Sequence, residues 1–276
     1  MSLRIASRPL LSLAAAFLLG SGSAAAHDFW IEPGDFRPQA GATIPIGLRV
    51  GMEFTGEPVA RKPERIEWFA SFGPQGRQPI EGAAGAEPAG TLRIAAAGIH
   101  LVAYRSLPAF IELGAKEFEG YLAEEGLQEI IALRARRGEK GKPGRETYSR
   151  CAKALLAAGG ARAGGHDRVL GMPLELVPDT SPYDPDGMKT ARMRLRLLLR
   201  GQPLRGALVA AVRKTEPKRV LTGWTDAAGR VTLALDKPGA WLVKSVHMFE
   251  PEAGGKADWE SLWTTLTFEI PDGAGD

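Results

Sequence analysis

The sequence predicts a mainly β protein with two β-sandwich domains and a helical insert between them. Three observations lead to this fold class. Apolar residues alternate with polar ones early in the chain, as at Ile44, Ile46 and Leu48, which is the period of a strand with one buried face. After residue 112 the spacing becomes that of helices. From about residue 171 the alternation returns, which indicates a second set of strands.

The first domain is predicted over residues 27–112. Further strands are expected at residues 66–70, 92–94 and 99–104, where apolar or aromatic side chains recur at every second position. Segments rich in glycine and proline, such as 73–76, separate these strands. Short strands with turn residues between them favour a sandwich.

The insert is predicted over residues 113–165. Phe118, Tyr121 and Ile130 recur at helical spacing, and a second helix is expected at residues 148–155. Between the two helices, residues 134–145 hold six basic residues and one acidic residue. Because that run also carries three glycines and a proline and has no aromatic side chain, a solvated linker is favoured over a site for an anionic partner.

The second domain is predicted over residues 166–276. Residues 192–199 alternate between apolar and mostly basic side chains, and residues 207–212 are apolar throughout, which is typical of a central strand. Two more strands are expected at 240–248 and 262–270. No glycine-rich loop for nucleotide binding occurs, which argues against a nucleotide-dependent enzyme.

The first 26 residues have the order of a secretory signal peptide. Two arginines precede an apolar run over residues 10–19, and Ala24 and Ala26 match the pattern of a cleavage site. The run is shorter than the ~20 apolar residues that a membrane-spanning helix needs. We therefore expect export to the periplasm, cleavage after Ala26, and a mature chain that starts at His27 and is not inserted in the membrane.

The predicted mature chain is close to neutral. The full sequence has 35 Lys and Arg against 32 Asp and Glu, and two of the arginines lie in the signal peptide, which leaves 33 against 32. This balance gives no reason to expect nucleic acid as a partner. Cys151 is the only cysteine, so an intramolecular disulfide and a cysteine-based zinc or redox site are excluded.

The four histidines are the main candidate metal ligands. After cleavage, His27 offers a free α-amine and an imidazole Nδ1, which can close on one ion as a six-membered chelate ring. His247 lies at the predicted end of a strand, where binding groups are often placed. His100 is expected to be packed and His166 to be solvated. We predict that His27 and His247 share one metal ion, with three additional candidate ligands: Asp28, Met248 and Glu260.

Seven segments carry a family resemblance. The first is His27-Asp28-Phe29-Trp30-Ile31, and the others follow in order at residues 148–155, 174–178, 201–207, 225–231, 239–248 and 259–263. In these segments the chain resembles a periplasmic family called domain of unknown function 4198, usually described as nickel-uptake-like, although that family more often has tyrosine at the position of Cys151. The resemblance implies immunoglobulin- or transthyretin-like sandwiches and a role near transition-metal uptake. It carries over His27 and His247 as histidine positions.

The leading hypothesis is a non-enzymatic periplasmic protein that captures or delivers a divalent transition ion, nickel or cobalt first and copper second. A membrane metal transporter is the expected partner. One alternative is a non-catalytic sandwich module for carbohydrate or protein, with Trp259 and Trp263 as contacts. A second alternative is a copper enzyme with a two-histidine brace.

Overall fold

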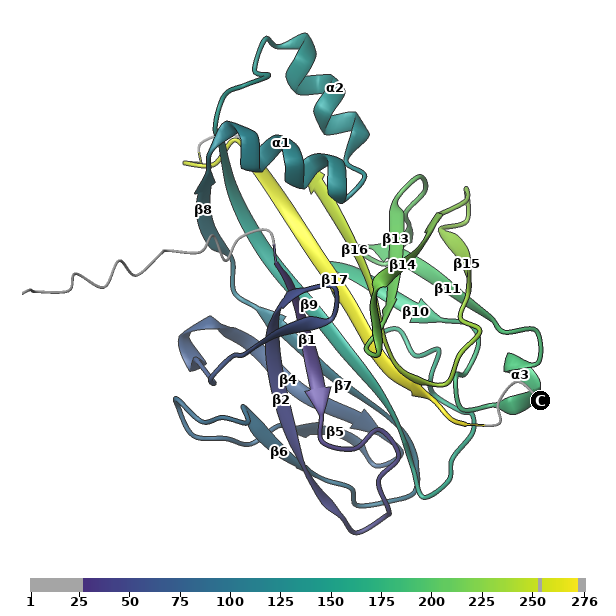
Figure 1. Ribbon diagram of the computed structural model, residues 1–276. Coiled ribbons are helices and arrows are strands. Elements are labelled where there is room, and N and C mark those ends of the chain that lie inside the picture. The colour runs from purple at the N-terminus through teal and green to yellow at the C-terminus, as the bar shows by residue number, and fades with distance from the viewer. Residues whose placement is uncertain (1–26, 253–254, 273–276) are drawn as a thin grey trace, which may run out of the picture.

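The computed structural model describes residues 27–252 and 255–272 of the protein. The predicted signal peptide, residues 1–26, lies outside the described residues. The described chain is built around one long, twisted central sheet that strands from both halves of the sequence form together (Figure 1). The prediction of a mainly β fold is therefore confirmed.

The central sheet has nine strands. Eight of them follow one another in the order β14 (Glu216–Trp224), β13 (Leu208–Arg213), β16 (Gly239–Phe249), β17 (Trp259–Ile270), β9 (Gly144–Ala158), β7 (Gly98–Ser106), β4 (Ile66–Gly73) and β5 (Gly76–Pro79). The ninth strand, β8 (Ala109–Leu113), pairs with the first part of β9. Among the described strands, only the β17–β9 pair is parallel. That pair joins the two halves of the chain, because β9 follows the N-terminal strands and β17 closes the C-terminal ones.

Two four-stranded sheets cover this central sheet. The first consists of β1 (Asp28–Pro33), β2 (Thr43–Met52), β3 (Thr55–Pro58) and β6 (Gly90–Arg93). The second consists of β10 (Leu174–Pro178), β11 (Arg192–Leu199), β12 (Gln202–Pro203) and β15 (Arg230–Ala234). Neighbours along β7 enter different cores, Val102 under the first cover and Leu101 under the second. Because successive side chains of a strand point to opposite faces, the two covers lie on opposite faces of the central sheet.

The two predicted sandwiches therefore share one sheet, which runs across the predicted boundaries between residues 27–112, 113–165 and 166–276. Each sandwich takes part of its core from β9: Ala154 belongs to the first core and Leu155 to the second. Neither cover has a complete sheet of its own to pack against. The sharing follows from the parallel pairing of β9 with β17.

Two helices lie at one end of the central sheet (Figure 1). They are α1 (Ala115–Glu124) and α2 (Gln128–Arg136), and their apolar residues form a cluster with Met248, Trp259 and Trp263 of β16 and β17. Two shorter helical turns complete the described elements, at Pro63–Arg65 and as α3 (Pro185–Met188). Phe118 and Tyr121 are on α1, as their helical spacing predicts, but Ile130 is on α2, so the single helix expected here is two helices. No helix among the described residues is long and apolar enough to cross a membrane.

The prediction of a second helix at residues 148–155 is wrong, because this segment is the middle of strand β9. Every residue from Cys151 to Ala158 is buried. A strand that is covered on both faces has no alternation of apolar and polar residues, so its sequence does not differ from that of a buried helix. The glycines at 159–160 end this strand rather than a helix.

The basic run at residues 134–145 is only partly the expected solvated linker. Arg136, Arg137 and Lys142 are exposed, but the side chain of Arg134 is 2% exposed. Its guanidinium donates to Glu119 of α1 and to the backbone oxygens of residues 139 and 142, and it lies 4.8 Å from the ring centre of Phe118. Arg134 therefore fixes the conformation of the loop that follows α2 through hydrogen bonds to its backbone.

Candidate functional site

The predicted mature N-terminus is held in place by the strand that follows it. His27 directly precedes β1, which pairs with β2 from Asp28 onward. On its other side, β1 is fixed by two side chains of β17: Thr265 Oγ1 donates to the Phe29 oxygen and Thr267 Oγ1 to the Ile31 oxygen, each at 2.8 Å. These contacts fix the position of the backbone next to His27.

Asp28 belongs to a buried charge cluster. Its carboxylate is 2.9 Å from Lys244 Nζ of β16, and the same Nζ donates to Glu125 Oε1, at the end of α1, at 2.8 Å. The residues Asp28 and Glu125 are 3% and 5% exposed. Lys244 thus lies between two acids that come from distant parts of the chain, and it connects β1, β16 and α1.

Burial controls the protonation of these groups. It raises the pKa of Asp28, although the positive charge of Lys244 partly offsets the rise. It also raises the pKa of Glu125 to about 7, and the negative charge of Asp28 adds to this increase. Burial acts against the charge of Lys244, but the two carboxylates outweigh it and raise the pKa of that ammonium above its usual range. Because the pKa of Glu125 is about 7, this carboxyl takes up a proton near neutral pH.

Arg150 of β9 lies against the same region. Its guanidinium carbon is 5.1 Å from the ring centre of Phe29 and 5.3 Å from that of Tyr148. Burial lowers the pKa of Arg150, and its Nη1 has no hydrogen-bond partner among the described residues. Aromatic faces attract the guanidinium and partly replace the water it has lost.

His27 itself is half-buried and carries an unsatisfied atom. Its Nδ1 is shielded from solvent and has no hydrogen-bond partner within the described part of the chain. Buried ring nitrogens normally have such a partner. Nδ1 is also the atom that would close a six-membered ring with the α-amine of a processed chain.

A neighbouring carboxyl group is satisfied without a cation. Glu146 of β9 accepts hydrogen bonds from Tyr121 of α1 at 3.3 Å and from Ser261 of β17, whose oxygen accepts from Trp263 Nε1 at 3.0 Å. Burial raises the pKa of Glu146. These bonds join α1 to the β9–β17 pair, which is a structural role.

His247 lies apart from the charge cluster. It is three residues from Lys244 on the same strand, so the two side chains point to opposite faces of β16. The imidazole is 5.8 Å from the ring of Phe249, and burial lowers its pKa. The described structure therefore does not bring His247 together with Asp28 and the adjacent His27.

The remaining predicted ligands are also divided between the two faces. Met248 is on the face of Lys244, but it is 3% exposed and packs in the cluster under the helices. Glu260 pairs across the sheet with Phe249, which places it on the face of His247. Within residues 27–252 and 255–272, no group of three or more His, Cys, Asp or Glu side chains has the arrangement of a metal site.

Trp259, Trp263 and His100 are all buried in the structure. Trp259 and Trp263 are 1% and 6% exposed, and Trp263 stacks on Tyr121 with ring centres 5.3 Å apart. They pack the core beneath α1 and are not available as surface contacts for a carbohydrate. His100 is packed as expected, at 6% exposure, with Nε2 3.0 Å from the Ala96 oxygen.

Lys244, Glu125 and Arg150 were not among the site residues predicted from the sequence. The sequence does mark two of these residues as unusual. Lys244 interrupts the largely apolar segment 240–248, and Arg150 lies in segment 148–155. A charged residue inside an apolar strand is seldom buried without a partner. Glu125 gave no such signal, since it is one of several acids near the end of α1.

Comparison with known proteins identifies the family of this chain. A search among proteins with curated descriptions finds no match to this chain. The family described as domain of unknown function DUF4198 matches residues 24–249, which confirms the suspected family and includes six of the seven segments; the segment at residues 259–263 lies beyond the match. Because this match covers most of the sequence, the chain belongs to the DUF4198 family.

Proposed function

We propose that this chain is an exported protein that binds a divalent transition metal through its processed N-terminal residue, His27. Nickel or cobalt is the first choice of ion and copper the second, because amine and imidazole nitrogens suit all three. The binding unit is the pair of nitrogens on His27, its α-amine and its imidazole Nδ1. Supplying two ligands from one residue reduces the ordering needed to form the site.

The observation that carries this proposal is the shielded Nδ1 of His27, which lacks a hydrogen-bond partner among the described residues. A metal ion would satisfy that nitrogen. The strand that follows supports the proposal as well, because the bonds from Thr265 and Thr267 hold β1 in a fixed position. Asp28 is the nearest acid in the sequence and would supply an oxygen ligand if it exchanged Lys244 for the metal.

This proposal differs from the predicted two-histidine site. The side chain of His247 is on the opposite face of β16 from Lys244, which pairs with Asp28. His247 is therefore not included among the ligands. A copper enzyme with a two-histidine brace would need that second imidazole, and it is therefore not favoured. A site with few protein ligands leaves positions on the metal for exchange, which suits delivery to a membrane transporter.

The proposed metal site requires that the protein is exported to the periplasm and processed. Export and cleavage after Ala26 would create the α-amine that the site needs. Intact-mass measurement of the protein recovered from the periplasm should give a chain that begins at His27. A chain that begins at any other residue would exclude the site.

Calorimetric titration of Ni(II), Co(II) and Cu(II) tests the metal site. The processed protein should bind one ion, and a form with one extra glycine before His27 should bind at least ~10-fold more weakly, because its amine has become an amide. His27→Ala should be equally weak. Affinity should fall as the pH is lowered, since both nitrogens must be unprotonated to bind.

His247→Ala is the matched control for this experiment. It removes an imidazole from the opposite face of β16, so the affinity of the processed protein should not change. Equal affinities of the processed and the glycine-extended forms would refute the proposal. A loss of binding in His247→Ala would instead restore the two-histidine site.

A further inference from the structure

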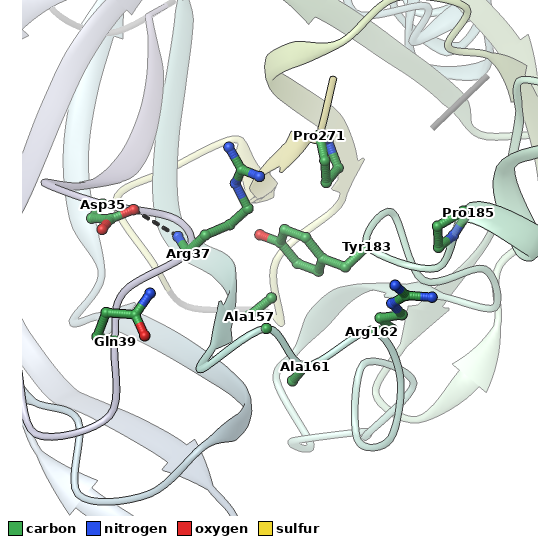
Figure 2. A pocket seen from close by; sticks show the side chains of 10 residues that line it. Asp35, Arg37, Gln39, Ala157, Ala161, Arg162, Tyr183, Pro185 and Pro271 are labelled. Carbon is green, nitrogen blue, oxygen red and sulfur yellow. Dashed lines mark hydrogen bonds between the residues drawn. The ribbon is translucent and has the colours of Figure 1, made fainter. Parts of the chain in front are cut away.

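A pocket lies at the other end of β1, away from His27. Its volume is about 580 Å³, which is within the range of small-molecule sites. Four separate parts of the chain line it: the segment after β1, the end of β9 with the turn that follows it, the segment around Tyr183, and Pro271 after β17. Figure 2 shows the ring of Tyr183 between Asp35 on one side and Arg162 on the other.

The walls of this pocket are fixed by hydrogen bonds. The amides of Ala157 and Gly159 donate to the oxygens of Phe36 and Pro38 at 2.9 and 2.8 Å, which attaches the segment after β1 to the end of β9. The Tyr183 hydroxyl donates to the Leu155 oxygen at 2.5 Å. Ser181 Oγ donates to the oxygen of Arg162. The pocket is thus formed before any ligand arrives, which lowers the entropic cost of binding.

Two opposite charges in the pocket have no ion-pair partner among the described residues. Asp35 accepts a hydrogen bond only from the backbone amide of Arg37, at 2.7 Å. Arg162 has no carboxylate within ion-pair distance in the described chain, and the acid that its charge affects, Asp186, is paired with Lys189 at 2.6 Å.

The other charge in the lining is neutralised. Arg37 forms an ion pair with Glu269 at 3.0 Å. The pocket therefore presents one free carboxylate and one free guanidinium. The hydroxyl of Tyr183 donates its proton to the Leu155 oxygen, so it is not a free donor for a ligand.

We propose that this pocket binds a small zwitterion, an amino acid or a short peptide, with its ammonium group at Asp35 and its carboxylate at Arg162. A simple anion would leave Asp35 unpaired, and a simple cation would leave Arg162 unpaired. A molecule that carries both charges satisfies both residues. Guanidinium groups recognise carboxylates through two parallel hydrogen bonds, which gives the Arg162 side its selectivity.

Calorimetry with four probes tests this site: alanine, the dipeptide Ala-Ala, N-acetyl-Ala-Ala and Ala-Ala amide. Alanine or Ala-Ala should bind to the wild-type protein, and whichever binds more tightly gives the length of the ligand. Each cap should weaken Ala-Ala at least ~10-fold, because it removes one charge-assisted contact.

Two variants assign the ends of the ligand. Asp35→Asn keeps the hydrogen bond to the amide of Arg37 and should weaken Ala-Ala at least ~10-fold while leaving N-acetyl-Ala-Ala unchanged. Arg162→Gln should weaken Ala-Ala to the same degree while leaving the amide unchanged. Arg93→Gln, at an exposed position on β6, is the control and should bind as the wild type does. If no probe binds at millimolar concentration, or if caps and variants change nothing, the proposal fails.

Discussion

Lys244 is the residue on which the charge balance around β1 depends. It is the only cation within ion-pair distance of Asp28 and Glu125 among the described residues. Both acids are buried, so neither can exchange its partner for bulk water. A buried acid that loses its partner either keeps an uncompensated charge, which destabilises the folded state, or takes up a proton.

Replacement of Lys244 by methionine should therefore destabilise the protein by about 3–5 kcal/mol at pH 8. The loss should be smaller at pH 5, where the acids are more readily protonated. Urea unfolding at both pH values measures the difference. Lys214→Met is the control, because Lys214 pairs with Glu32 at the surface and should cost at most about 1 kcal/mol. Equal losses in the two variants would contradict this account.

The pKa of Glu125 predicts a second effect of pH. Its value in the folded protein, about 7, is above the ordinary 4.5, so the folded state keeps a proton that the unfolded state has lost. The contribution of Glu125 to the free energy of unfolding therefore decreases as the pH rises between about 4.5 and 7. Glu125→Gln carries no such proton, so its stability relative to wild type should increase over this interval by up to about 3 kcal/mol. Parallel stability curves of the two proteins would show that this carboxyl is not perturbed.

Among the elements, the α1–α2 pair depends on one buried guanidinium. Arg134 connects α1 through Glu119 with the loop after α2 through two backbone oxygens. The apolar faces of the helices rest on Trp259, Trp263 and Met248. The end of α1 thus contributes Glu125 to the charge cluster, and Arg134 holds the loop after α2 against the helices.

Arg134→Met should lower the free energy of unfolding by about 2–4 kcal/mol, because it leaves two backbone oxygens and Glu119 without their donor. Amide hydrogen exchange in the loop at residues 137–143 should increase more than in the central sheet. Arg136→Met, which changes an exposed arginine two residues away, should stay within about 0.5 kcal/mol of wild type. A similar effect of both variants would mean that the buried contacts of Arg134 contribute little.

Whether a strand can be recognised from its sequence depends on how many of its faces are buried. Strands with one buried face, such as β2 and β11, alternate between buried and more exposed residues and were predicted. Strand β9 was mistaken for a helix, since its residues from Cys151 onward are covered on both faces. The period that distinguishes strands from helices disappears when both faces are buried.

In the whole molecule, the shared central sheet makes the two halves depend on each other. The core under the first cover includes Ala152 and Ala154 of β9, and the core under the second includes Leu155 of the same strand. Removal of β9 would expose an edge of β7 on one side and of β17 on the other. Unpaired edges and half-cores do not form stable units on their own.

The predicted domains 27–112 and 166–276 should accordingly not fold as separate fragments. Circular dichroism and NMR spectra of each fragment should be those of unfolded or aggregated chains. Residues 27–276 should unfold in one cooperative transition in calorimetry. A fragment with a dispersed NMR spectrum and its own thermal transition would show that the sandwich it contains is autonomous.

The sequence by itself determined the mainly β composition, the position of the first helix and the candidate role of His27 as a first residue. These are local properties, because alternation, helical spacing and a signal-peptide pattern are each read within about 26 residues. Tertiary structure decided that β9 pairs with β17, that Lys244 lies between Asp28 and Glu125, and that His247 faces away from them. These contacts join residues more than 90 positions apart or depend on which face of a strand is covered, and neither property is recorded in local sequence.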